Sequence, residues 1–161
     1  WVIEMEEGLL VRKIDWGTVI DHIPAWRADR VMRLIDAEQL VRDPEVSVII
    51  LKNVPSRKYG RKDVIKLYHH YLSKTDAALV KLIYPTVTVN YIRDWKVEKY
   101  SPELPETIEG KVRCPELTCI SNSKRDPVVR RFRVLKEEGY IQCYYCDAIV
   151  EFSSIPDLIA V

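Results

Sequence analysis

The chain has 161 residues, of which 47% are apolar, and its 25 Lys and Arg against 24 Asp and Glu leave a formal charge of +1. This composition predicts a soluble, folded protein, and the near-zero charge excludes a strong overall attraction to nucleic acid or an anionic membrane. The longest apolar runs, such as VIIL at 48–51, are far shorter than the roughly 20 residues of a membrane-spanning helix. The acidic start, WVIEMEEG, does not resemble a signal peptide, so we expect a cytoplasmic protein.

A strand and a helix are the first predicted elements. The strand covers VRKIDWGTVID, residues 11–21, and Gly17 can interrupt it with a bulge or a turn. Pro24 suits the start of the following helix. One apolar face of that helix is formed by residues that recur at three- and four-residue spacing: Ala28, Val31, Met32 and Ile35.

The next segments predict a β-hairpin. EVSVIILKNV (45–54) is typical of a buried strand, PSRKYGRK (55–62) of a loop, and DVIKLY (63–68) of a returning strand. A short helix over DVIKLYHHYL (63–72) is the alternative, because periodicity alone does not decide between strand and helix here.

A second helix and two strands complete the first part of the chain. TDAALVKLIYP (75–85) predicts the helix, with Thr75 as N-cap, Asp76 in the first turn and Pro85 as the stop. Two further segments predict strands: TVTVNYI and WKVEKY. The resulting order matches the split βαβ, or ferredoxin-like, arrangement, in which two helices cover one face of a sheet.

A connector divides the chain. SPELPETIEG (101–110) contains two prolines and a glycine but only two large apolar residues. We therefore expect an α+β protein with two domains, residues 1–103 and residues 104–161, the second small and rich in β-structure. All four cysteines follow this boundary and all three histidines precede it, so the two domains should differ in chemistry.

The four cysteines have metal-site spacing. Cys114 and Cys119 lie in CPELTC, and Cys143 and Cys146 lie in CYYC. Two short-spaced pairs joined by a hairpin suit tetrahedral Zn²⁺, because each pair forms one half of the site. Four thiolates leave no position for water, so we predict one structural zinc ion that supplies much of the folding free energy of this domain.

Other interpretations of the cysteines are less favoured. Disulfides, or a redox-active CYYC, would need a compartment or a context that the sequence does not indicate. A zinc ribbon that binds nucleic acid is the main alternative function, since RRFR (130–133) is basic. The plainer reading is an exposed strand face, in which arginines alternate with Phe132 and Val134 before Glu137 and Glu138.

Asp21 and His22 stand side by side in GTVIDHIPA (17–25), so they are candidates for chemistry or for binding. Catalysis is disfavoured, because the first domain has no cysteine, no GxSxG and no HExxH, and adjacent strand residues point to opposite faces. A small nucleotide-processing enzyme is therefore only a third possibility.

Binding groups occur elsewhere in the first domain. Lys62 and Lys66 in GRKDVIKL are four residues apart, which puts them on one side of either a strand or a helix. Lysine is a good point charge for phosphate, and the Asn90 amide could contact a base or a ribose. A solvated basic face is the plainer alternative for these residues.

Five motifs in this order resemble the regulatory chain of aspartate carbamoyltransferase. They are GTVIDHIPA, GRKDVIKL, TVNYI followed by WKV, the SPELPETIEG connector, and CxxxxC with CxxC. The resemblance covers nearly the whole chain. It implies a non-catalytic regulatory subunit in pyrimidine biosynthesis that binds CTP as feedback inhibitor and ATP as activator, often with UTP assisting.

The resemblance also implies partners and a nucleotide site. The first domain would pair with a second regulatory chain, and the zinc domain would dock on a separate catalytic chain, with neither nucleic acid nor membrane involved. Lys66 would meet the phosphates, Asp21 the ribose and His22 the phosphate or sugar. Carried over by motif, the site comprises Val11, Arg12, Lys13, Ile14, Asp21, His22, Lys62, Lys66, Asn90, Ile92, Trp95 and Val97.

Overall fold

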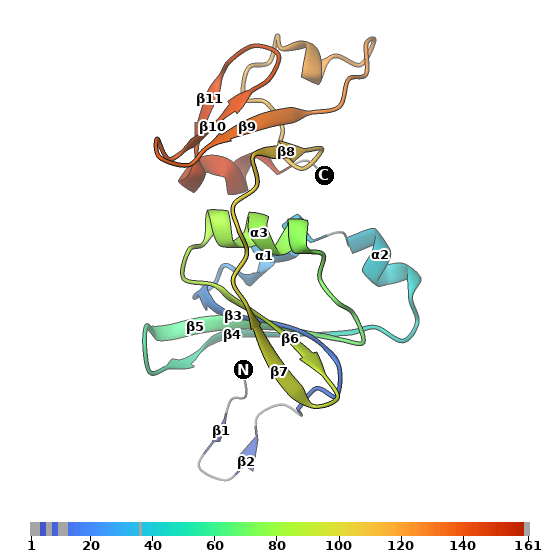
Figure 1. Ribbon diagram of the computed structural model, residues 1–161, viewed down its shortest axis with the longest axis vertical. Helices are drawn as coiled ribbons and strands as arrows, with labels where there is room; N and C mark the ends of the chain where they lie inside the picture. The colour runs from blue at the N-terminus through green and yellow to red at the C-terminus, as the bar shows by residue number, and fades with distance from the viewer. Residues whose placement is uncertain (1–3, 6–7, 10–12, 36, 160–161) are drawn as a thin grey trace. The chain divides into compact units, whose positions relative to one another are not determined.

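The computed structural model describes residues 4–5, 8–9, 13–35 and 37–159. The chain divides into two compact units, Trp1–Pro102 and Glu103–Val161. Figure 1 shows the first unit from blue to yellow and the second from yellow through orange to red. Among the described helices, none combines the length and apolar character needed to cross a bilayer.

The first unit is built on a five-stranded antiparallel sheet in the order β4-β5-β3-β6-β7. Its strands are β3 (Gly17–Pro24), β4 (Ser47–Ser56), β5 (Gly60–Tyr68), β6 (Thr88–Arg93) and β7 (Lys96–Tyr100). The first four strands and two helices follow the predicted split βαβ order, and β7 is added at one edge. The α+β prediction is therefore confirmed. Two short strands, β1 (Glu4–Met5) and β2 (Gly8–Leu9), pair separately.

Helices cover one face of this sheet (Figure 1). They are α1 (Ala28–Leu34), α2 (Ala37–Arg42) and α3 (Lys74–Ile83). The sequence did not predict α2. The expected helix start at Pro24 is wrong, because Pro24 ends β3 and the carboxylate of Asp63 accepts hydrogen bonds from the N–H groups of Trp26 (3.0 Å) and Ala28 (2.9 Å). The N-cap of α3 is Ser73, not Thr75, since the Ser73 hydroxyl accepts from the Asp76 N–H.

The predicted hairpin of the second and third strands is confirmed, and its helical alternative is wrong. The expectation that residues 45–54 form a buried strand needs correction. Within the described residues β4 pairs with β5 alone, so it is an edge strand, and Val48 and Ile50 remain 37% and 36% exposed. An apolar edge strand and a buried central strand have similar compositions, which explains the error.

The sheet face that the helices do not cover carries its own apolar cluster. This cluster consists of Ile14, Val19, Val54, Val64 and Ile92, with Leu51, Tyr68 and Val97 packed against it. Lys66 and Asn90 are the cross-strand partners of Val19, and partners in an antiparallel pair share a face. These two predicted binding residues therefore lie on the uncovered face beside the apolar cluster.

The second unit is a four-stranded antiparallel sheet in the order β11-β10-β9-β8. Its elements are β8 (Thr107–Glu109), a 3₁₀ turn (Ile120–Asn122), β9 (Arg131–Leu135), β10 (Tyr140–Cys143), β11 (Ile149–Glu151) and a 3₁₀ segment (Phe152–Leu158). Its buried side chains are few, with Phe132, Ile141 and Ile155 at 1% exposure or less. Such a small core needs additional stabilisation.

Candidate functional site

Asp21 and Lys62 form a largely buried ion pair at the end of β3. Lys62 Nζ lies 2.9 Å from Asp21 Oδ1, and their side chains are only 12% and 3% exposed. Burial by itself raises the pKa of Asp21, but the hydrogen bond and charge of Lys62, together with the His22 N–H, outweigh it. The pKa of Asp21 therefore lies below its ordinary value, and the carboxylate is ionised at neutral pH.

A β-bulge brings His22 to the same place. The β3–β5 register shifts between Ile20 and Ile23, so two residues, Asp21 and His22, stand opposite one residue of β5. His22 has φ of +57°, and its Nδ1 lies 3.2 Å from the hydroxyl of Thr88, the residue paired with Asp21. Strict alternation predicts opposite faces, but the bulge instead places both side chains beside Thr88.

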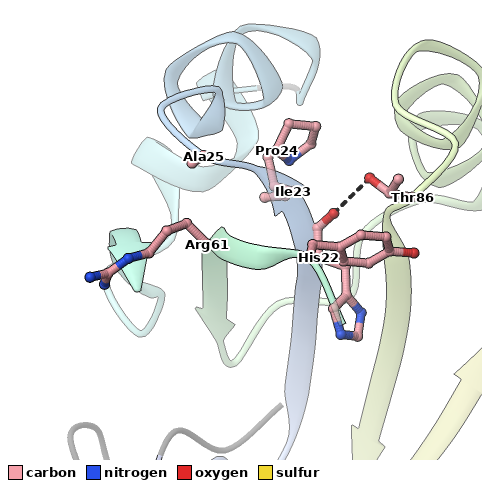
Figure 2. A pocket seen from close by; sticks show the side chains of 7 residues that line it. His22, Ile23, Pro24, Ala25, Arg61 and Thr86 are labelled. Carbon is pink, nitrogen blue, oxygen red and sulfur yellow. Dashed lines mark hydrogen bonds between the residues drawn. The ribbon is translucent and has the colours of Figure 1, made fainter. Parts of the chain in front are cut away.

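A cavity of about 270 Å³ adjoins His22. Figure 2 shows the Thr86 hydroxyl directed at the His22 carbonyl oxygen, a bond of 2.9 Å, and the Arg61 side chain extending away from His22. The Tyr59 ring meets the imidazole edge-on. Burial, aided by the charges of Lys62 and Lys58, outweighs Asp21 and keeps the pKa of His22 below its ordinary value. His22 is therefore a neutral donor or acceptor at neutral pH.

Lys66 and Asn90 lie on either side of Val19. Val19 pairs with Lys66 in β5 and with Asn90 in β6, so the three side chains share the uncovered face. Lys66 is fully buried, which lowers its pKa below the ordinary value, although the charge of Asp21 partly offsets this effect. Within the described part of the chain, the buried Asn90 Oδ1 accepts no hydrogen bond. A buried amide oxygen without a donor is costly, and a bound ligand could supply that donor.

Three of the other predicted nucleotide residues belong to the apolar part of the same face. Ile14 and Ile92 are buried in the apolar cluster, and Val97 packs against it. Lys13 is exposed, and Trp95 is 64% exposed in the turn between β6 and β7. Val11 and Arg12 lie outside the described residues.

A latch made of Asp15, Trp16 and His69 ties the segment before β3 to the sheet. His69 Nε2 lies 3.1 Å from Asp15 Oδ1, its backbone N–H donates to the Trp16 carbonyl, and its ring stacks on Trp16 with centroids 5.1 Å apart. The Trp95 N–H donates to the Asp15 carbonyl at 2.9 Å. The latch therefore holds residues 13–16 against both β5 and the β6–β7 turn.

Sequence reasoning missed Thr88 and Tyr59, which contact His22, and Arg61, which lines the cavity. Thr88 had a signal, because it is two residues before Asn90 and so lies on the same strand face. Tyr59 and Arg61 had none, because only the hairpin turn brings them to the bulge in β3.

The four cysteines of the second unit converge. Their sulfur atoms all lie within 4.8 Å of one another, with Cys114 to Cys146 at 3.5 Å and Cys119 to Cys143 at 3.7 Å. These separations exceed the S–S bond of about 2.05 Å, and the four cysteines are free thiols. A tetrahedral ion with metal–sulfur bonds of about 2.3 Å separates its sulfurs by about 3.8 Å, so this donor set fits such an ion.

Local hydrogen bonds shape both halves of the cysteine cluster. The Asn122 side-chain amide donates to the carbonyls of Cys114 (3.0 Å) and Glu116 (2.8 Å), which closes the first loop. In the second loop the Cys143 N–H donates to Ala148, and the Asp147 N–H donates back to Cys143. The loops therefore hold the four sulfurs in position, and four sulfur ligands would fill a tetrahedral metal site without a water.

Family models match both units of the chain. The model described as aspartate carbamoyltransferase regulatory chain, allosteric domain, matches residues 9–102. The model described as aspartate carbamoyltransferase regulatory chain, metal binding domain, matches residues 106–156. The cysteine cluster falls inside the second match.

Curated relatives agree along nearly the whole chain. The aspartate carbamoyltransferase regulatory chain of Thermofilum pendens is 42% identical over 155 residues, covering 95% of this chain and 96% of the relative. The regulatory chain of Methanopyrus kandleri is 39% identical, covering 94% and 96%, and that of Thermococcus kodakarensis is 37% identical, covering 94% and 97%. The resemblance found in the sequence is confirmed: this protein belongs to the aspartate carbamoyltransferase regulatory chain family, whose members are regulatory and not catalytic subunits.

Proposed function

We propose that the first domain, residues 1–103, binds CTP and ATP as opposing effectors, with UTP assisting CTP. The observation that carries this proposal is the uncovered sheet face, where Asp21, Lys62, Lys66 and Asn90 meet around Val19. Two lysines, one carboxylate and an amide suit a molecule with phosphates, ribose hydroxyls and a polar base.

Each group has a role in this proposal. Lys66 binds the phosphates as a point charge, and Lys62 can share them because its ion pair with Asp21 holds it nearby. Asp21 accepts hydrogen bonds from ribose hydroxyls, and His22 contacts phosphate or sugar beside its cavity. Main-chain groups at 11–14 and at Ile92 distinguish cytosine from adenine. Because Lys66 is fully buried, binding requires a local opening of this face.

The second domain, residues 104–161, binds one zinc ion in this proposal. A set of four thiolates favours Zn²⁺, because softer sulfur ligands select it over oxygen-preferring ions. The ion would supply a four-coordinate cross-link between the two cysteine loops, and Cys114, Cys119, Cys143 and Cys146 would hold it.

The domain partners follow from exposed apolar surface. We assign docking on the catalytic chain to the zinc domain, where Leu117 and Ile149 are 80% and 58% exposed. We assign pairing of two regulatory chains to the first domain, where the apolar edge strand β4 offers unpaired backbone groups along Val48 and Ile50.

Calorimetric titration of the full chain with CTP and ATP tests the effector proposal. Both nucleotides should bind at one site per chain without turnover. Lys66→Met should weaken both by about tenfold or more, because both share the triphosphate and a charged hydrogen bond is worth about 1.5 to 3 kcal/mol. Lys136→Met, an exposed lysine of the second unit, is the matched control and should change little.

Two outcomes would contradict this assignment. Equal affinity of the Lys66→Met and unmutated chains for both nucleotides would place the effectors elsewhere. Tight binding of a duplex oligonucleotide would favour the nucleic-acid alternative. That alternative is weakened because two of the arginines that would contact nucleic acid already pair with acids. Arg131 pairs with Glu109 (2.9 Å) and Arg133 with Asp147 (3.6 Å).

A further inference from the structure

A second cavity of about 380 Å³ lies in the first unit, on the sheet face opposite to the proposed nucleotide site. It is bounded by β6, β7 and the segment that leads into α3. Tyr91 lines it, whereas the neighbouring residues Asn90 and Ile92 belong to the other face by strand alternation. The cavity is therefore separate from the lysines of the nucleotide site.

Three tyrosines form the walls of this cavity. The Tyr91 ring lies between the other two, with centroids 6.1 Å from Tyr71 and 5.5 Å from Tyr100. The Tyr91 hydroxyl donates to the Leu72 carbonyl (2.6 Å) and the Tyr71 hydroxyl to the Ile92 carbonyl (3.2 Å), so both rings are fixed. Burial, with Tyr100 and Asp76 nearby, raises the pKa of Tyr91 to about 12, so this wall stays neutral.

Two cations stand over these walls. Lys74 Nζ lies 5.4 Å from the centroid of the Tyr100 ring, and the Arg93 guanidinium lies 5.5 Å from that of Tyr71. Both side chains are exposed, and one acid, Glu98, is among the described lining residues. Lys99 borders the cavity but pairs with Asn90, so it belongs to the nucleotide face and is not counted as a cation of this cavity. Exposed cation–π contacts are weak, so the cations can turn to a charged ligand at little cost.

We propose that this cavity binds a small anion that carries a planar ring. The ring would stack on the fixed tyrosine walls, and Lys74 and Arg93 would hold the anionic group at the rim. The volume suits a small molecule, and the lining combines aromatic surface with a few convergent polar groups, as ligand sites generally do. Either a nucleoside monophosphate or an aromatic carboxylate has this chemistry.

Titration calorimetry of the full chain with uridine monophosphate, benzoate and inorganic phosphate tests this proposal. At least one of the ring-bearing anions should bind with a dissociation constant of about 1 mM or below. Inorganic phosphate should bind about tenfold more weakly than the better of the two, because it cannot stack. Binding of benzoate alone would identify a carboxylate site, and binding of uridine monophosphate alone a phosphate site.

Substitutions then locate the binding. Arg93→Gln and Lys74→Gln should each weaken the binding of the ring-bearing anion about fivefold. Arg27 is an exposed arginine outside the cavity, so Arg27→Gln should have no effect. Tyr100→Leu keeps an apolar wall but removes the stacking surface, and should also weaken binding. Lys66→Met should leave this binding in place.

Three results would overturn the proposal. The first is no binding of either ring-bearing anion at about 10 mM, a concentration well above the expected dissociation constant. The second is phosphate binding as tightly as the better ring-bearing anion. The third is binding that survives Arg93→Gln and Lys74→Gln but is lost in Lys66→Met, which would move the ligand to the nucleotide site and leave the proposed effector function intact.

Discussion

The two candidate sites are built in different ways. The polar cluster of the first unit draws Asp21, Lys62, Lys66 and Asn90 from three strands, and the sheet must form before these residues meet. The cysteine cluster draws its ligands from two short loops that their own hydrogen bonds shape. The first site therefore depends on a fold that exists without its ligand, whereas the second contributes to the stability of its own fold.

The cores of the units explain this difference. In the first unit, helices pack on one face of a five-stranded sheet and an apolar cluster covers part of the other. The second unit buries few large side chains, among them Phe132 and Ile141. A core of that size supplies little stability, so cross-linking by a metal ion is expected to be decisive there and irrelevant to the first unit.

Metal removal should give the largest effect. Chelation, or Cys143→Ser, removes a binding free energy on the order of 10 kcal/mol and should unfold the second unit. Amide-exchange mass spectrometry should show loss of protection after residue 103, with the first unit unchanged, and Ser153→Ala, an exposed control, should behave like the unmutated chain. Full protection of both units after complete metal removal would contradict the expectation that the second unit needs a metal ion to stay folded.

Gly17→Ala should give the next largest effect, now in the first unit. Gly17 has φ of +150°, and a Cβ atom there would lie 2.1 Å from the backbone carbonyl oxygen of Leu67. We expect a loss of about 3 kcal/mol in the free energy of unfolding, because backbone has to move. Gly139→Ala is the control in the second unit, with φ of +79° but open space, and should cost about 1 kcal/mol. Equal losses in urea unfolding would contradict this explanation.

The Asp21–Lys62 ion pair should give a smaller, pH-dependent effect. The pKa of Asp21 in the folded state lies below its ordinary value, so its stabilisation is complete above about pH 4, the unfolded value, and is lost as pH falls through the folded pKa. Asp21→Asn should cost about 2 kcal/mol at pH 7 and progressively less as the pH falls below about 4. Urea unfolding measured at pH 7 and at a series of pH values below about 4 tests this, and a cost that does not change with pH would show that the charge is unimportant.

The latch should give the smallest effect on stability. His69 and Asp15 are 33% and 42% exposed, so solvent screens their ion pair, and His69→Gln should cost less than about 1 kcal/mol. His70→Gln, the neighbouring histidine, is the control. If the latch positions residues 13–16 for nucleotide, His69→Gln should reduce the binding free energy of CTP by more than it reduces the free energy of unfolding. Unchanged CTP affinity would show that the latch does not contribute to the nucleotide site.

Much of the fold was readable in the sequence because local patterns dictated it. The hairpin strands and the helix around residues 75–83 have the composition or periodicity of the structures that they form, although periodicity alone also allowed a helix over residues 63–72. The edge position of β4 was not readable, because an apolar edge strand differs from a central one only in its neighbours. The start of α1 was misplaced because its cap, Asp63, is 35 residues away.

The sequence by itself determined the cysteine cluster, since two short spacings and thiolate chemistry leave few alternatives to a tetrahedral metal. It also indicated Lys62, Lys66 and Asn90, whose strand positions put them on one face. Only the tertiary structure decided that Asp21 pairs with Lys62, that a bulge turns His22 to the same side, and that three tyrosines enclose a second cavity. Register shifts and contacts between distant strands leave no local pattern in the sequence, because they depend on how whole elements pack.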